Sequence, residues 1–158
     1  MKKMPKKKTI RHEIQTEYLG KVYGKEFLSL VPQVVKKLRA IKRKHPFDAI
    51  AFTGSSGAAL AYPLSYLMKI PLIHVRKADD SHYSGGLIEG TISSKRYVII
   101  DDFIESGKTV KRIIKNINKE LKKSGAKPAA ICLYSEWSSK NQFNYYGNKI
   151  PIFTVKNK

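Results

Sequence analysis

The sequence predicts an α/β fold in which a mostly parallel, twisted sheet is flanked by helices. Short apolar runs alternate with amphipathic helical patterns, and two of these runs end directly in candidate ligand loops, residues 53–57 and 101–109. Such alternation favours right-handed crossovers and therefore parallel strands with helices on both faces. Ligands bind these sheets at the carboxyl ends of the strands, so both loops are expected at one edge.

The first expected helix runs from Gly24 to Lys44, because apolar residues recur there at helical spacing, with Pro32 marking a kink or a fresh start. A second helix is expected over 58–68, although Pro63 weakens its first half. Residues 79–90 are polar and contain glycine, which indicates a loop or a β-ribbon. The remaining expected elements are strands over 48–53, 71–75, 97–100, 129–134 and, after an irregular aromatic stretch, 150–155, and a helix over 107–123.

The chain of 158 residues has the size of one ordinary domain and contains no internal repeat. We therefore expect a basic N-terminal tail over 1–11 and a single domain over 12–158. The lone cysteine, Cys132, lies in an apolar run and is expected in the core. No apolar run is long enough for a transmembrane helix, and the basic N-terminus lacks the apolar stretch of a signal peptide, so a cytoplasmic protein without membrane contact is expected.

The charge is strongly basic, with 31 Lys and Arg against 12 Asp and Glu, a formal net charge of +19. Such a field attracts anions, which include nucleic acid, a membrane surface and a polyphosphate metabolite. A lysine-rich surface can equally serve solubility alone.

The most informative segment is 98–109, Val-Ile-Ile-Asp-Asp-Phe-Ile-Glu-Ser-Gly-Lys-Thr. An apolar strand delivers the adjacent carboxylates Asp101 and Asp102, and a helix then opens at Gly107. A helix start offers unpaired N–H groups and a positive dipole end, which suit a phosphate. A nucleotide-triphosphatase loop would need glycine where Asp102 stands. The segment instead suits a ligand that carries a diol next to a phosphate.

The segment resembles the phosphoribosyl pyrophosphate signature of the type I phosphoribosyltransferases. The resemblance implies that Asp101 and Asp102 bind the ribose hydroxyls, directly or through Mg²⁺. It also implies that the 5′-phosphate is wrapped by Glu105, Ser106, Gly107, Lys108 and Thr109. Glu105 matches an acid to which purine-base enzymes assign proton transfer, and is the candidate catalytic residue, one methylene longer than the usual Asp.

The same resemblance implies three supporting loops. The pyrophosphate loop would comprise Thr53, Gly54, Ser55, Ser56 and Gly57, helped by Arg76 and Lys77 after the next strand. Ala78–Gly90 would be a mobile lid containing Ser81, His82, Tyr83 and Ser84. Either end of the chain would supply a small hood over the base, with aromatic candidates Tyr18, Tyr23, Tyr134, Trp137, Phe143, Tyr145 and Tyr146, none of which is assigned to the base.

The implied function is transfer of the phosphoribosyl group from phosphoribosyl pyrophosphate to a nitrogenous base, with Mg²⁺ as cofactor and, as in much of the family, a homodimer. Glu105 and the following Gly-Lys-Thr favour a purine, whereas Val75-Arg76-Lys77 keeps orotate open. The alternative is a regulator that senses phosphoribosyl pyrophosphate or binds nucleic acid, which the net charge favours. An unusual acceptor or a nucleotide hydrolase also remains open.

Overall fold

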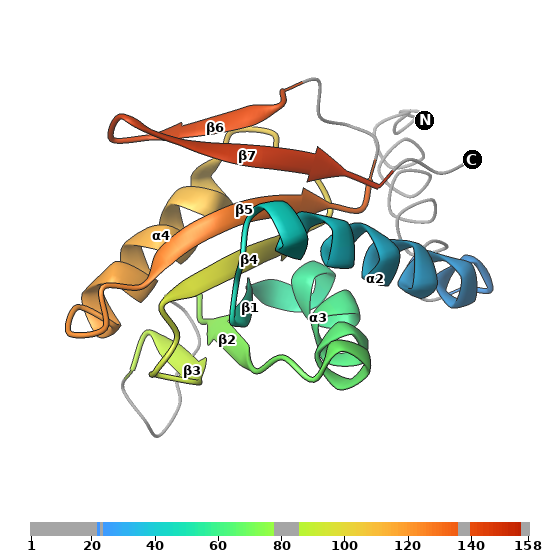
Figure 1. The fold of residues 1–158 in the computed structure, drawn as a ribbon, viewed down its shortest axis with the longest axis horizontal. Coiled ribbons are helices and arrows are strands. Elements are labelled where there is room, and N and C mark those ends of the chain that lie inside the picture. Colours follow the sequence, from blue (N-terminus) through green and yellow to red (C-terminus); the bar gives the residue numbers. More distant parts are fainter. Residues whose placement is uncertain (1–21, 23, 78–85, 136–139, 156–158) are drawn as a thin grey trace, which may run out of the picture.

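The computed structural model describes residues 22, 24–77, 86–135 and 140–155, and its elements form one seven-stranded sheet with helices on both faces (Figure 1). The strand order is β3-β2-β1-β4-β5-β7-β6. The five inner strands run parallel, and β3 and β6 pair antiparallel at the two edges. The strands are β1 Ala49–Phe52, β2 Leu72–Val75, β3 Ile88–Gly90, β4 Arg96–Asp101, β5 Lys127–Leu133, β6 Gln142–Tyr145 and β7 Asn148–Thr154. The predicted mostly parallel α/β fold is confirmed.

Three helices in the described part of the chain cover the sheet: α2 Glu26–Lys44, α3 Gly54–Met68 and α4 Lys108–Glu120. Helices α2 and α3 pack on one face with Ile50 and Phe52 of β1, whereas α4 packs on the other face with Ala49 and Ala51. Alternate residues of a strand point to opposite faces, so one apolar strand serves both cores. None of the described helices is long and apolar enough to cross a bilayer.

The two internal prolines do not break their helices. Helix α2 continues through Pro32, and its buried stripe extends on both sides of the proline, from Leu30 and Val31 to Val34 and beyond. Burying one such side chain contributes about 1.5–3 kcal/mol, and several of them together outweigh the roughly 3 kcal/mol cost of an internal proline. Helix α3 likewise continues through Pro63 and begins at Gly54, four residues before the predicted start.

Strand β6 was missed, because residues before 150 were expected to be irregular. Residues Gln142–Tyr145 instead pair antiparallel with β7. The connecting turn places Tyr146 and Gly147 at φ 45° and 81°, and two positive φ values give the turn type whose twist suits a hairpin. On the opposite edge, the antiparallel pairing of β3 with β2 confirms the predicted ribbon for Ile88–Gly90.

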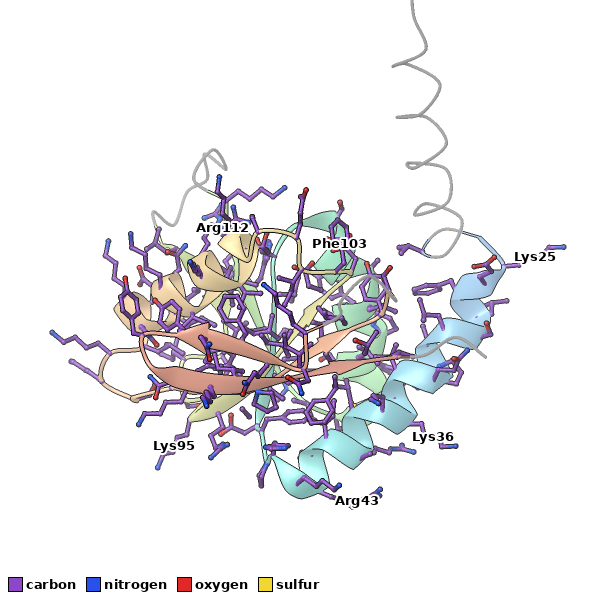
Figure 2. The ribbon with its side chains drawn as sticks, turned by 90° about the horizontal axis from the view of Figure 1, so that it is seen from above. Lys25, Lys36, Arg43, Lys95, Phe103 and Arg112 are labelled. Atoms are coloured by element: carbon purple, nitrogen blue, oxygen red, sulfur yellow. The ribbon has the colours of Figure 1, made fainter. Side chains whose placement is uncertain are left out.

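Basic side chains project from widely separated elements. Figure 2 shows Lys25, Lys36 and Arg43 along α2, and Lys95 just before β4. The net charge is therefore not gathered in one place. The lone cysteine, Cys132, is buried as expected, and burial raises the pKa of its thiol to about 12, so it behaves as a core residue.

Gly57 lets α3 pack closely against the sheet. A Cβ atom there would lie 2.9 Å from the Phe52 Cβ and 3.3 Å from the Ile100 carbonyl oxygen. Gly57→Ala is therefore expected to lower the free energy of unfolding by about 1–2 kcal/mol through overpacking. Urea unfolding measures this, with Tyr66→Ala, an 83% exposed position of the same helix, as the control expected to change by less than about 0.5 kcal/mol. Equal stability of Gly57→Ala and the wild type would contradict the close packing.

Candidate functional site

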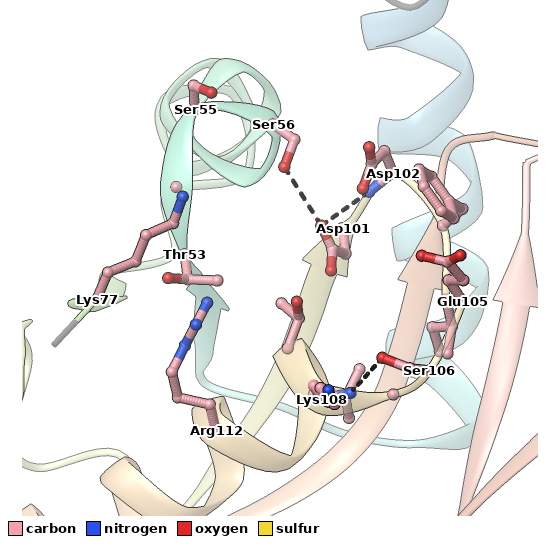
Figure 3. A pocket seen from close by; sticks show the side chains of 16 residues that line it. Thr53, Ser55, Ser56, Lys77, Asp101, Asp102, Glu105, Ser106, Lys108 and Arg112 are labelled. Atoms are coloured by element: carbon pink, nitrogen blue, oxygen red, sulfur yellow. Dashed lines mark hydrogen bonds between the residues drawn. The ribbon is translucent and has the colours of Figure 1, made fainter. Parts of the chain in front are cut away.

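The carboxyl ends of β1, β2 and β4 meet at a pocket of about 220 Å³ (Figure 3). The two segments that were predicted separately, after β1 and after β4, form its opposite walls. The lining residues are Thr53, Gly54, Ser55, Ser56, Lys77, Asp101, Asp102, Phe103, Ile104, Glu105, Ser106, Gly107, Lys108, Thr109, Val110 and Arg112. The parallel topology brings the segments together, as the sequence predicted for strand ends of one sheet.

Two helices begin in this pocket. Thr53 is the extended N-cap of α3, and Gly107, at φ 73°, is the N-cap of α4. Neither N-cap residue makes a side-chain cap hydrogen bond, and at α4 the Lys108 backbone N–H donates a long hydrogen bond of 3.4 Å to the Ser106 hydroxyl (Figure 3). The N–H groups of a first helical turn suit an anion, which would replace this long contact. The segment 53–57 was predicted to be a loop, but it is an N-cap followed by the first turn of α3. Its N–H groups nevertheless lie in the pocket, as predicted. Gly107 also has no room for a side chain, because a Cβ would lie 2.6 Å from the Phe143 ring.

An acidic pair, the buried Asp101 and the half-buried Asp102, stands between the two helix starts. Asp101 is 4% exposed and accepts hydrogen bonds from the Ser56 hydroxyl at 3.4 Å and the Asp102 backbone N–H at 3.1 Å (Figure 3). Burial, then the hydrogen bond and negative charge of Asp102, raise the pKa of Asp101 to about 8. Asp101 therefore favours its protonated form near neutral pH. Hydroxyl donors or a cation from a ligand would favour the fully ionised pair.

The pair suits one kind of metal site. In the part of the chain that the structure describes, no three His, Cys, Asp or Glu side chains are grouped to hold a metal. Mg²⁺ differs from other metals in that it commonly takes only one or two carboxylates, with substrate oxygens and water completing the octahedron. Asp101 and Asp102, two adjacent carboxyls in a pocket that also contains two helix starts and the basic residues Lys77 and Arg112, fit that requirement.

The side of the pocket near Thr53 is basic and includes Arg112, a residue that was not predicted (Figure 3). Its side chain reaches from α4 toward Thr53, and Lys77 lies beside them (Figure 3). Within the described residues, the Arg112 Nε and the Oγ1 of Thr53, which is 3% exposed, are buried without a hydrogen-bond partner. Buried polar groups are normally paired, so these atoms indicate a polar ligand. Helical spacing could have revealed Arg112, because it follows Thr109 by three residues on a predicted helix.

Two predicted residues do not line the pocket. Gly57 packs against Phe52 instead. Arg76 is buried, and its Nε lies 3.3 Å from Glu89 Oε1, which ties β2 to β3. Successive residues of an extended chain point in opposite directions, so only Lys77 of the basic pair reaches the pocket. His74, on the strand before this basic pair, stacks on Phe52 with 4.8 Å between the ring centroids.

Of the predicted hood aromatics, the buried Tyr134 donates its hydroxyl hydrogen to the Ser56 carbonyl at 2.9 Å, and Phe143 packs over Gly107. Tyr145 and Tyr146 line other hollows. The aromatic residue that lines this pocket is Phe103, 39% exposed, for which no role was predicted. The tail 1–11, the lid residues Ser81, His82, Tyr83 and Ser84, and also Tyr18, Tyr23 and Trp137 lie outside the described residues.

Comparison with known proteins gives a family and a fold. A family model described as PRTase-CE matches residues 7–157. An orotate phosphoribosyltransferase from Listeria monocytogenes is 30% identical over 131 residues, 78% of this chain and 61% of that protein. The transcriptional regulator GfcR from Thermoplasma acidophilum is 30% identical over 128 residues, 78% of this chain and 62% of that protein. The chain thus spans only about three fifths of the length of these relatives.

Two solved structures share the fold at low identity. Adenine phosphoribosyltransferase from Saccharomyces cerevisiae superposes with a TM-score of 0.59 at 18% identity, covering 82% of this chain and 78% of that chain. Orotate phosphoribosyltransferase from Aeropyrum pernix superposes with a TM-score of 0.56 at 15% identity, covering 82% of this chain and 70% of that chain.

Proposed function

Because the chain belongs to the PRTase-CE family and has the type I phosphoribosyltransferase fold, we propose that it transfers the phosphoribosyl group of phosphoribosyl pyrophosphate to a nitrogenous base. The observation that carries the proposal is the pairing of two helix starts across an acidic pair whose first member, Asp101, is buried. Two separate anionic groups with a diol between them match this arrangement, and phosphoribosyl pyrophosphate has that composition.

Each part of the ligand has a counterpart in the pocket. The start of α4, over Ser106 to Thr109, holds the 5′-phosphate with backbone N–H groups. Asp101 and Asp102 accept hydrogen bonds from the ribose hydroxyls. The start of α3, with Lys77 and Arg112, holds the pyrophosphate. These assignments explain why the polar atoms of Thr53 and Arg112 have no partner among the described residues.

In the reaction, the bond from the ribose C1 to the pyrophosphate oxygen breaks, and a bond from C1 to a base nitrogen forms. Positive charge develops on the sugar ring, as in glycosyl transfer generally, and the carboxylates of Asp101 and Asp102 stabilise it. Bound Mg²⁺, held by these carboxylates and substrate oxygens, would neutralise the pyrophosphate charge. Glu105, exposed at the pocket rim, is proposed to accept the proton that the base nitrogen loses.

The acceptor is proposed to be a purine or orotate. Glu105 favours a purine, whereas the Listeria relative is named for orotate. Incubation with phosphoribosyl pyrophosphate, Mg²⁺ and adenine, guanine, hypoxanthine or orotate in turn, followed by pyrophosphate release and nucleotide mass, tests both. Pyrophosphate release with one base identifies the acceptor. No release with any base, from a protein that still binds phosphoribosyl pyrophosphate, would overturn the transferase and favour the second candidate, a regulator that senses this ligand. The relative named as the transcriptional regulator GfcR supports that second candidate.

Arg112→Gln is expected to raise the KM for phosphoribosyl pyrophosphate about tenfold to a hundredfold, because a charged hydrogen bond to the pyrophosphate contributes roughly 1.5–3 kcal/mol. Its stability should not fall, since the substitution removes a buried Nε that has no partner among the described residues. Steady-state kinetics and thermal unfolding measure the two effects. Lys119→Gln, an exposed cation on the same helix, is the matched control. An unchanged KM for Arg112→Gln would contradict its assignment to the pyrophosphate.

A further inference from the structure

A basic groove runs between α4 and the β6–β7 hairpin, outside the pocket described above. It consists of two adjoining hollows of about 320 and 570 Å³, which share Tyr145 and Tyr146. We call it the α4–hairpin groove, defined by Lys111, Lys115, Lys122, Lys149, Tyr145 and Tyr146. Arg112 lines both the first hollow and the candidate active pocket, so the groove begins at the pocket edge.

The charges of the groove all have one sign. Lysines and Arg112 line the two hollows, and none of the described Asp or Glu residues lines either of them. The exposed Lys111 and Lys115 stand about 6 Å apart along the helix axis, one turn from each other. A concave surface on which all the charged side chains are cations concentrates polyanions. A chain of phosphates could therefore contact several of these lysines in succession.

The two tyrosines distinguish this groove from the lysines spread elsewhere on the surface. Tyr146 is 91% exposed at the hairpin turn and packs edge-on against Tyr145, with ring centroids 4.8 Å apart at 86°. Its backbone takes the left-handed conformation, φ 45°, which costs a bulky residue on the order of 1–3 kcal/mol. Asn or Gly would suit this turn position better. An exposed aromatic ring at a strained backbone position suggests that Tyr146 offers its ring for stacking with a ligand.

We propose that the α4–hairpin groove binds single-stranded nucleic acid, with its lysines on successive phosphates and Tyr146 stacked on a base. Cations that follow a backbone beside an exposed aromatic ring are the usual elements of single-strand recognition. A duplex keeps its bases stacked on each other, so it offers Tyr146 no base face. The first hollow is lined by Lys, Arg, Asn and Tyr side chains, and the Ile and Leu side chains that line the second hollow are buried, so a lipid surface is the poorer match.

Binding of a labelled oligothymidylate of about 12 nucleotides to the full chain, followed by fluorescence anisotropy over a range of salt, tests the proposal. The groove variant is Lys111→Gln/Lys115→Gln/Lys149→Gln. The control, Lys36→Gln/Arg43→Gln/Lys44→Gln, removes the same charge from exposed positions of α2, which lies apart from Arg112 and α4 (Figure 2). The groove variant should bind at least about tenfold more weakly, with a log–log salt slope smaller by about 2. Equal losses in the two variants would assign binding to the general charge and overturn the proposal.

A second pair of variants tests the stacking. Tyr146→Ala should weaken oligothymidylate binding about tenfold, while Tyr146→Phe, which keeps the ring, should bind like the wild type. Unchanged binding by Tyr146→Ala would overturn the single-strand assignment, as would equal affinity for a duplex of the same length. Displacement of the oligonucleotide by anionic phospholipid vesicles at a matched charge would assign the groove to membranes instead.

The design separates this proposal from the transferase. The groove variants leave every residue of the active pocket unchanged, including Arg112, so they should retain phosphoribosyl transfer. If the wild type transfers phosphoribosyl groups but does not bind the oligonucleotide, only the groove proposal is overturned. If it binds the oligonucleotide but transfers nothing, only the transferase proposal is overturned. Near-ultraviolet circular dichroism of each variant confirms that the fold is intact.

Discussion

Asp101→Asn/Asp102→Asn is expected to reduce kcat/KM for phosphoribosyl transfer by at least about a thousandfold while the protein stays folded. Both side chains line the pocket, and the proposed reaction develops positive charge on a sugar bound beside them. The carboxamides keep the shape of the side chains but supply no negative charge. Asparagine at 101 can still accept the hydrogen bonds from Ser56 and from the Asp102 backbone, so the local structure should persist.

Pyrophosphate release measures the loss of transfer, and calorimetric titration with phosphoribosyl pyrophosphate measures the loss of binding. Glu26→Gln/Glu120→Gln is the matched control, because it removes two negative charges from exposed helix positions outside the pocket. The control should behave like the wild type. Transfer by the double Asp variant within tenfold of the wild type, with the control unchanged, would contradict the assigned role of the acidic pair.

The segment from β4 into α4 could be predicted because its information is local. An apolar run, two carboxylates and Gly107 at the start of an amphipathic pattern fix a strand, a turn and a helix without reference to the rest of the chain. The convergence of this segment with residues 53–57 was also predictable, since strand ends of a parallel sheet share one edge.

Other features depend on contacts that are distant in the sequence. Gly54 and Gly57 suggested a loop, but α3 begins at Gly54 because Gly57 lets the helix approach Phe52 and the β4 backbone. Strand β6 exists through its pairing with β7, and a short stretch of four residues does not reveal this by itself. Arg76 and Lys77 were predicted to act together because they are neighbours in the sequence. Successive side chains of an extended chain point in opposite directions, so Lys77 lines the pocket and Arg76 contacts Glu89 instead.

Asp101→Asn by itself is expected to make the protein more stable than the wild type in alkaline solution. The pKa of Asp101 is raised from 3.8 to about 8 in the folded state, so folded protein holds a proton that the unfolded chain has lost. The stability associated with this proton is fully present below about pH 4 and is lost as pH rises toward and through 8. Between about pH 5 and pH 8 the wild type should therefore lose about 3 kcal/mol through this group.

The asparagine variant lacks this loss, because its side chain stays neutral and can donate to Asp102 as the protonated carboxyl does. Thermal unfolding should show a melting temperature higher than that of the wild type by about 6–12 °C near pH 8, and a smaller difference near pH 5. Glu105→Gln, an exposed carboxyl of the same pocket, is the control that should leave the pH dependence of the wild type unchanged. An equal pH dependence for Asp101→Asn and the wild type would show that the buried carboxyl is ionised in the free protein.

The same proton connects stability to ligand binding. A ribose diol or Mg²⁺ favours the ionised pair, so binding should expel the proton from Asp101, and affinity should rise with pH up to about 8. Calorimetric titrations in two buffers that differ in ionisation enthalpy would report this release directly. The wild type should release close to one proton near neutral pH, whereas any residual binding by Asp101→Asn should release none. The buried Asp101 carboxyl destabilises the free protein at high pH, where it must ionise without a ligand to compensate the charge. A pocket arranged for a ligand that stabilises the ionised form shows the usual conflict between stability and a binding site.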